Sequence, residues 1–180
     1  MTVVLPNGQI LELGRSVTKT SSGYSLLHLM IGSEGTLGVI TELTLKLIPN
    51  PKEDISFILP FADIDAAISA VPKIKLAGLS PQSIEFMERD IVDSSANYTG
   101  NKIIPTVIDG KEAGAYILVT LDGNDQDEIF QRAETLAEIG DEIGAYDTLV
   151  LSHPADKRAV WEARSAFLTV IEAETDLIDE

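Results

Sequence analysis

The sequence predicts an α+β fold in which helices pack on one face of a ferredoxin-like antiparallel sheet. Two observations in residues 51–180 lead to this prediction. Short apolar runs typical of strands alternate with amphipathic segments typical of helices. Two of these helical segments are also long enough to cross from one strand to another. With 44% hydrophobic residues in 180, the chain can bury a core of this kind.

The first fifty residues differ from the rest of the chain. Pro49 and Pro51 interrupt the pattern of regular elements between the two portions. Residues 1–50 carry 3 basic and 3 acidic side chains, whereas residues 51–180 carry the other 10 basic and 26 acidic ones, which gives −16. We therefore predict a boundary near Asn50.

Composition excludes several classes of function. A net charge of −16 repels nucleic acid and anionic membranes. The sequence has no run of about eighteen apolar residues, so we expect no membrane span. It has no cysteine, and therefore no disulfide, iron–sulfur ligand or thiol nucleophile. The first residues lack a secretory signal pattern, so we expect a cytoplasmic protein.

The portion 1–50 predicts three elements around polar loops. Asn7-Gly8 lies between two β-rich runs, which predicts a hairpin over residues 3–13. Residues 24–31 predict a short helix that ends at Gly32. Residues 39–48 alternate between apolar and polar side chains, which predicts a strand.

The portion 51–180 predicts the sheet and its helices. Asp63 and Asp125 are suited to cap helices, because each precedes an amphipathic segment. The predicted strands cover residues 55–59, 83–87, 116–121 and 147–151, and the predicted helices residues 63–71, 89–95, 125–139 and 155–174.

A glycine-rich loop connects the predicted helix 24–31 to the strand 39–48. Its glycines fall at a spacing of three, at Gly32, Gly35 and Gly38. Such a loop is either a tight turn that leads into a buried strand, or a loop whose amides face an anionic ligand. A dinucleotide fingerprint or phosphate loop needs the order strand, glycines, helix. The order here is reversed, so both of those motifs are excluded.

These residues also resemble a known family. Gly23-Tyr24-Ser25-Leu26, followed by the run from Gly32 to Thr41, resembles the FAD-linked oxidases of the vanillyl-alcohol oxidase superfamily. The similarity is to the D-lactate dehydrogenase and glycolate oxidase flavin-subunit branch. Two later segments, residues 81–90 and Trp161-Glu162-Ala163-Arg164, resemble parts of the substrate-side domain of that family.

The resemblance implies an FAD-dependent oxidoreductase. It would oxidise a D-2-hydroxy acid of the lactate or glycolate type to the 2-oxo acid by hydride transfer to FAD, and an external electron acceptor would reoxidise the flavin. It also implies a partial chain. Residues 1–50 would be the C-terminal portion of the FAD-binding domain and residues 51–180 the N-terminal portion of the substrate (cap) domain. We expect this chain alone to be inactive.

The resemblance assigns site residues in both portions. Arg164 would bind the substrate carboxylate, because a guanidinium can bind a carboxylate through two hydrogen bonds. The alternative is a surface pair between Arg164 and Glu162 or Glu174. The residues implied to contact FAD are Gly23, Tyr24, Gly35, Gly38, Val39 and Ile40.

Three further ionisable residues lie outside these assignments. The Glu34 carboxylate either accepts hydrogen bonds from loop amides or acts as a base. His28 lies among apolar residues and is expected to pack partly buried, whereas His153 precedes Pro154 and is expected to cap a turn. The two histidines are too far apart in the sequence to form a local metal site.

A second hypothesis is a non-catalytic acidic module or subunit that docks on a partner flavoprotein. Under the first hypothesis, that of a partial chain, residues 1–50 would expose strand edges that other strands of the flavin domain normally cover. We therefore expect dimers or larger homo-oligomers of this chain.

Overall fold

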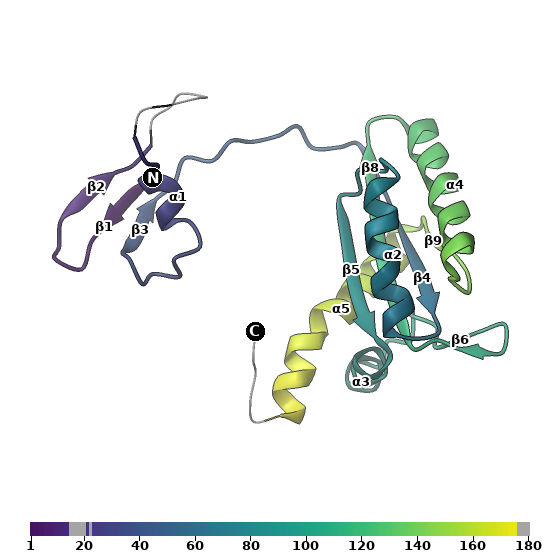
Figure 1. Cartoon of the computed structure of the whole chain (residues 1–180). Coiled ribbons are helices and arrows are strands. Elements are labelled where there is room, and N and C mark those ends of the chain that lie inside the picture. The colour runs from purple at the N-terminus through teal and green to yellow at the C-terminus, as the bar shows by residue number, and fades with distance from the viewer. Residues whose placement is uncertain (15–20, 22, 176–180) are drawn as a thin grey trace. The chain divides into compact units, whose positions relative to one another are not determined.

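A computed structural model describes residues 1–14, 21 and 23–175. The chain divides into two compact units, Met1–Pro49 and Asn50–Glu180, which we call the N-terminal and C-terminal units. Each unit is described by itself below (Figure 1).

The N-terminal unit is a small antiparallel sheet with one short helix. Strands β1 (Thr2–Val4), β2 (Ile10–Glu12) and β3 (Val39–Glu42) lie in the order β2-β1-β3. The predicted hairpin is confirmed, with Val3 opposite Leu11 and the Gly8 amide donating to the Leu5 carbonyl at 2.8 Å. The helix α1 covers Leu26–Met30.

Strand β3 is shorter than the sequence predicts. It pairs with β1, which has only three residues, so the ladder of hydrogen bonds ends at Glu42. The prediction of a strand through residue 48 is therefore wrong beyond that point. The alternating leucines that suggested it, Leu43, Leu45 and Leu47, are exposed and face no described strand.

The C-terminal unit contains a four-stranded antiparallel sheet in the order β5-β8-β4-β9. Its strands are β4 (Glu53–Phe61), β5 (Ser83–Glu88), β8 (Ala115–Gly123) and β9 (Leu149–Leu151). Its helices are α2 (Ile64–Leu76), α3 (Arg89–Thr99), α4 (Gln126–Ile143) and α5 (Pro154–Glu174). A small hairpin, β6 (Val107–Ile108) and β7 (Lys111–Glu112), was not predicted.

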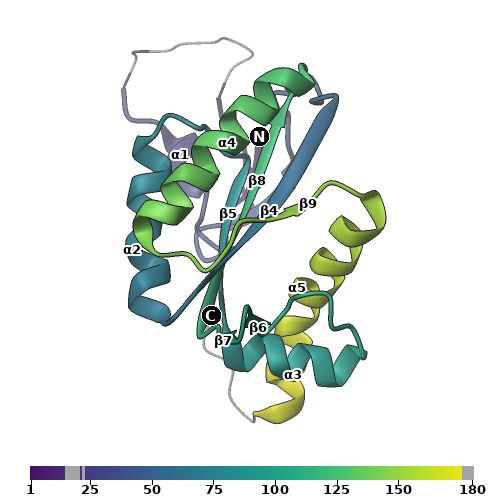
Figure 2. The ribbon, with the colours of Figure 1, turned by 90° about the vertical axis from the view of Figure 1, so that its right-hand side faces the viewer.

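Helices cover both faces of this sheet. Figure 2 shows α2 and α4 together on one side and α3 and α5 on the other. Side chains of α2 and α4 pack with Phe57 and Ile117, and side chains of α3 and α5 pack with Ile58 and Leu118. The mixed α and β class is confirmed. The sequence predicted helices on one face only, which is correct for α2 and α4. It missed the second layer, in which α3 and α5 cover the other face. Because β4 is buried continuously from Ile55 to Phe61, it has apolar neighbours on both faces.

Short polar contacts fix where the helices begin and how they pack. The Asp63 carboxylate accepts from the Ala66 amide at 2.8 Å and starts α2, as predicted. His153 caps α5, since its Nδ1 accepts from the Ala155 amide at 3.2 Å. Ser95 of α3 donates to the Ala163 carbonyl of α5 at 2.7 Å, which joins the two helices.

Candidate functional site

The glycine-rich loop contains a tight turn over residues 33–36. The Thr36 amide donates to the Ser33 carbonyl at 2.9 Å. Both central residues have positive φ, 49° at Glu34 and 77° at Gly35, which is the pattern of a type I′ turn. No described atom lies within 4 Å of the Cβ that a side chain at Gly35 would have. The side of Gly35 on which a side chain would project therefore faces open space.

Gly38 has a different environment. It is buried, and a Cβ there would lie 2.8 Å from Val3 Cγ1 and 3.0 Å from the Val4 carbonyl oxygen. Glycine at this position allows β3 to start beside β1. The structure thus gives Gly38 a packing role within the small sheet.

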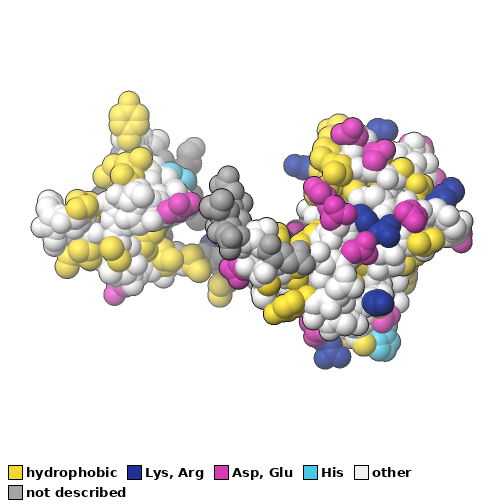
Figure 3. Space-filling view, turned by 90° about the horizontal axis from the view of Figure 1, so that it is seen from below, with side chains coloured by type: hydrophobic (Ala, Val, Ile, Leu, Met, Phe, Trp, Pro, Cys, Tyr) yellow, Lys and Arg dark blue, Asp and Glu magenta, His cyan; other side chains and the backbone are white. Residues whose placement is uncertain are grey.

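The other predicted cofactor residues are exposed in the N-terminal unit. Tyr24 is fully exposed, Val39 is 63% exposed and Ile40 is 39% exposed. Gly23 is exposed as well. Figure 3 shows many hydrophobic side chains and few charged ones on this unit. Among its described residues, the buried hydrophobic side chains are Val3 and Met30. The unit therefore presents most of its apolar side chains outward.

The polar residues near the loop have local roles. Ser25 caps α1, and its hydroxyl also lies 2.6 Å from His28 Nδ1. His28 is exposed, so the expectation that it packs partly buried is wrong. Among the described residues, nothing donates a hydrogen bond to the Glu34 carboxylate, so it does not fix the turn in the way expected.

In the C-terminal unit, Arg164 of α5 forms an ion pair with Glu85 of β5. Its Nη2 donates to Glu85 Oε2 at 2.8 Å. Of the predicted surface partners, Glu162 is not bonded to Arg164, and the side chain of Glu174 lies outside the described part of the structure. Within the described part of the chain the bond to Glu85 is the one hydrogen bond that the Arg164 side chain donates, and it leaves Nε and Nη1 without a partner among those residues.

A row of hydroxyl groups lies on the same sheet face as Glu85. Ser56 and Thr120 are buried, and their hydroxyl oxygens are 2.9 Å apart. Ser83, which pairs with Thr120 across β5 and β8, has a buried Oγ without a hydrogen-bond partner in the described structure. Sequence reasoning missed Ser83 and Glu85. The available signal was their alternation with Ile84 and Phe86, which puts polar side chains on one face of a half-buried strand.

Two other arginines of this unit are structural. Arg132 donates to the carbonyls of Leu79, Ser80 and Asp122, which fixes the turns beside α2 and α4. Arg89 donates to Asp93 at 2.7 Å and to two backbone carbonyls. The hydrogen bond that Arg89 donates to Asp93 raises the pKa of the Arg89 guanidinium above its usual value. Both guanidinium groups are therefore already bonded to protein atoms.

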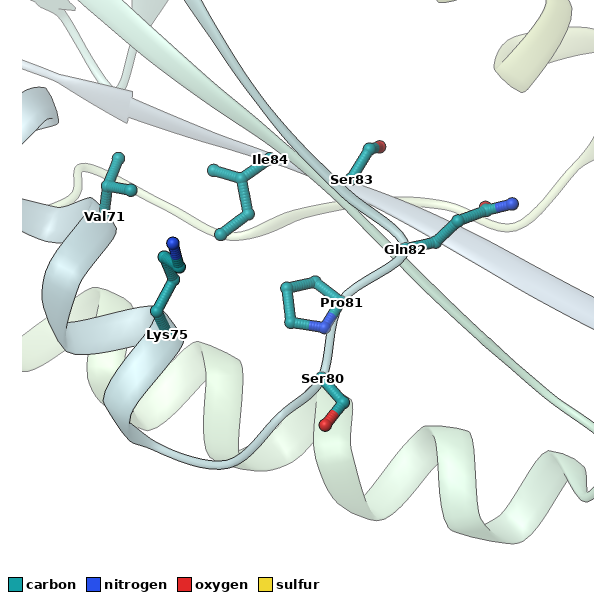
Figure 4. Close-up of a pocket in the computed structure, with 7 residues that line it drawn as sticks. All are labelled: Val71, Lys75, Ser80, Pro81, Gln82, Ser83 and Ile84. Atoms are coloured by element: carbon teal, nitrogen blue, oxygen red, sulfur yellow. The ribbon is translucent and has the colours of Figure 1, made fainter. Parts of the chain in front are cut away.

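A shallow pocket between α2 and the start of β5 is a weaker candidate. Figure 4 shows Val71, Lys75, Pro81 and Ile84 facing one another, while the side chains of Ser80, Gln82 and Ser83 point away from them. A specific small-molecule site needs polar groups that converge on the ligand. Here a single ammonium group faces apolar side chains.

Metal and membrane sites were also searched. Over the described part of the chain, no three His, Asp or Glu side chains come together as metal ligands would. Within the same residues, no helix has the length and apolar character needed to cross a bilayer.

Comparison with known proteins identifies the family. The family model for FAD linked oxidases, C-terminal domain, matches residues 50–178. The chain is 50% identical over 180 residues to a D-lactate dehydrogenase of Anaerostipes hadrus. This match covers 100% of this chain and 38% of that protein. It is 33% identical over 172 residues to the glycolate oxidase subunit GlcD of Bacillus subtilis, covering 94% of this chain and 34% of that protein.

The fold is found in solved structures too. An alkyldihydroxyacetonephosphate synthase matches 93% of this chain and 32% of its own, with a TM-score of 0.54 and 21% identity. The chain thus spans about a third of the length of each of these three proteins. The predicted family is confirmed: the chain belongs to the FAD-linked oxidases, with FAD as the cofactor of the family.

Proposed function

We propose that this chain is part of an FAD-dependent oxidoreductase that oxidises a D-2-hydroxy acid, of the lactate or glycolate type, to the 2-oxo acid. The observation that carries the proposal is the 50% identity to a D-lactate dehydrogenase along the whole chain. The similarity to a glycolate oxidase subunit supports the same class of substrate. When bound, FAD supplies the redox chemistry by accepting a hydride.

In this proposal the N-terminal unit is the last portion of the flavin-binding domain. Its outward apolar side chains, among them Tyr24 and Val39, fit a surface that a cofactor and further strands would cover. The open space beside Gly35, where a side chain would otherwise project, fits close approach of a ligand to the loop backbone. The cofactor residues of this chain would be Gly23, Tyr24, Gly35, Gly38, Val39 and Ile40.

The C-terminal unit is the first portion of the substrate domain. Its strand order, with α2 and α4 on one face, supports a ferredoxin-like arrangement to which α3 and α5 are added. In it Arg164 binds the substrate carboxylate through the guanidinium donors that Glu85 leaves unused. The charge and two-point contact would hold the substrate carboxylate in a single orientation.

The test uses the full-length protein that contains this chain. D-lactate, in the absence of air, should bleach the oxidised flavin absorbance, and L-lactate should not. Arg164→Met should raise the KM for D-lactate by about tenfold or more, because a charge-assisted hydrogen bond is lost. Arg158→Met removes an exposed arginine of the same helix and is the matched control. A full-length protein that contains FAD but reacts with no D-2-hydroxy acid would refute the proposal.

A further inference from the structure

We infer that Glu85 makes the Arg164 site selective for monocarboxylic 2-hydroxy acids over dicarboxylic ones. The inference rests on the proposed function and names the class of substrate within it. Glu85 would act as a positioning and specificity-determining residue through its ion pair with Arg164. Its carboxylate would repel a second carboxylate on the substrate.

The geometry keeps Glu85 close to the site. Its position on β5 is fixed by pairing with Leu118 of β8 in the sheet. Two residues further along the strand, Met87 is buried on the same face. The Glu85 side chain is 27% exposed and reaches the 45% exposed Arg164 at 2.8 Å. A ligand bound to Arg164 would therefore lie beside a carboxylate that the sheet holds in place.

The charges of this pair favour a monoanion. Arg164 and Glu85 together carry no net charge, and a substrate with one carboxylate can use the remaining guanidinium donors. A second carboxylate on the substrate would be repelled by Glu85, because like charges a few ångströms apart disfavour one another.

Neighbouring cations of α5 do not offset this repulsion. Lys157 lies two helical turns from Arg164 on the same face, and its ammonium group is already bonded to Asp54 at 2.8 Å. Arg158 is six residues away, so it projects about 120° around the helix from Arg164. A second substrate carboxylate at Arg164 therefore meets Glu85 rather than either cation.

The experiment compares D-lactate with D-malate, which is lactate with a carboxylate added at its methyl group. Full-length wild-type protein should have the higher kcat/KM for D-lactate. Glu85→Gln keeps an oxygen that can accept from Arg164 and removes only the charge. The variant should shift the kcat/KM ratio toward D-malate by about fivefold or more, and added salt should reduce this shift.

Glu88→Gln is the matched control, since it makes the same change on the opposite face of β5 and should leave the ratio as in the wild type. Glu85→Gln that lowers both kcat/KM values equally would show a merely structural role and overturn the inference. An unchanged ratio in a protein that oxidises D-lactate overturns this inference alone. Absence of activity on either acid in FAD-loaded wild type overturns the proposed function and this inference with it.

Discussion

Lys157 and Asp54 are joined by two hydrogen bonds. The Lys157 Nζ donates to the Asp54 carboxylate at 2.8 Å and to the Asp54 backbone carbonyl at 2.9 Å. This contact ties the first turns of α5 to the start of β4, just as Arg164 ties a later turn to β5. Helix α5 is thus attached to two strands that are not neighbours in the sheet.

Breaking the contact between Lys157 and Asp54 should lower the stability of the protein modestly. Lys157→Met keeps most of the aliphatic stem and removes both hydrogen bonds. We expect a loss of about 1 kcal/mol in the free energy of unfolding, the upper end for a partly exposed pair. Urea denaturation measures it. The neighbouring Arg158→Met should change the free energy by less than about 0.5 kcal/mol. A loss equal to that of the control would show that the contact contributes nothing.

Tyr116 gives a prediction that depends on pH. Its ring is buried, and in the described structure its hydroxyl has no hydrogen-bond partner. Burial raises the pKa of Tyr116 above its usual value near 10. The unfolded chain therefore loses this proton first as the pH rises. The contribution of the protonated Tyr116 to the free energy of unfolding is therefore complete below about pH 10. It declines as the pH rises from there toward the raised pKa of the folded state.

Tyr116→Phe should remove this decline. At pH 7 the variant should be as stable as the wild type or more so, because an unpaired buried hydroxyl is lost. Above pH 10 it should lose less of its free energy of unfolding than the wild type loses. Denaturation curves at pH 7 and above pH 10 test both statements, with the exposed Tyr98→Phe as control. Marked destabilisation at pH 7 would mean that the hydroxyl makes a contact of its own.

Gly114 should not accept any side chain. A Cβ there would lie 2.3 Å from the Ala62 carbonyl oxygen. The backbone cannot easily shift, because two backbone hydrogen bonds hold it. The Gly114 amide donates to the Phe61 carbonyl at 2.8 Å, and the Gly114 carbonyl accepts from the Arg89 amide at 3.0 Å. We expect Gly114→Ala to cost about 2–3 kcal/mol by thermal or urea unfolding.

Gly110→Ala is the control for this substitution. Gly110 has a φ of +78° and open space around its missing Cβ, so only backbone strain of about 1 kcal/mol is expected there. Equal losses in the two variants would show that strain, rather than the contact with Ala62, explains the effect at Gly114.

The two units should differ in their dependence on the rest of the protein. Both clusters of buried apolar residues lie within the C-terminal unit. A chain that lacks residues 1–49 should therefore have a melting temperature within about 2 °C of that of the 180-residue chain, a difference below about 0.5 kcal/mol.

The 180-residue chain itself should purify without flavin and associate through its N-terminal unit. Flavin absorbance at one FAD per chain, or a monomer by sedimentation, would contradict these expectations.

Most elements of the C-terminal unit could be predicted from the sequence, because their signals are local. Apolar runs such as Tyr116 to Leu121 and capping residues such as Asp63 identify strands and helix starts without knowledge of their partners. The second helix layer was harder to predict, since the burial of β4 on both faces appears in the sequence only as an uninterrupted apolar run. The β6–β7 hairpin has two residues in each strand, too few for a periodic pattern.

The candidate site shows the same limit. Arg164 was predicted from a short sequence pattern, but its partner Glu85 lies 79 positions away. No spacing rule links residues so distant. Strand 39–48 was overestimated because its alternation is genuine, whereas the described part of the chain supplies a partner strand only as far as Glu42.

The order β5-β8-β4-β9 also affects how this chain is made. Within the C-terminal unit β4 is synthesised first, yet its two neighbours in the sheet, β8 and β9, follow only after α2, β5 and α3. Because a ribosome adds about 5–20 residues per second, several seconds pass between the synthesis of the apolar stretch of β4 and that of β8. During that interval β4 has no neighbouring strand on either edge. Newly made chains are therefore most open to aggregation, or to capture by chaperones, before β8 emerges.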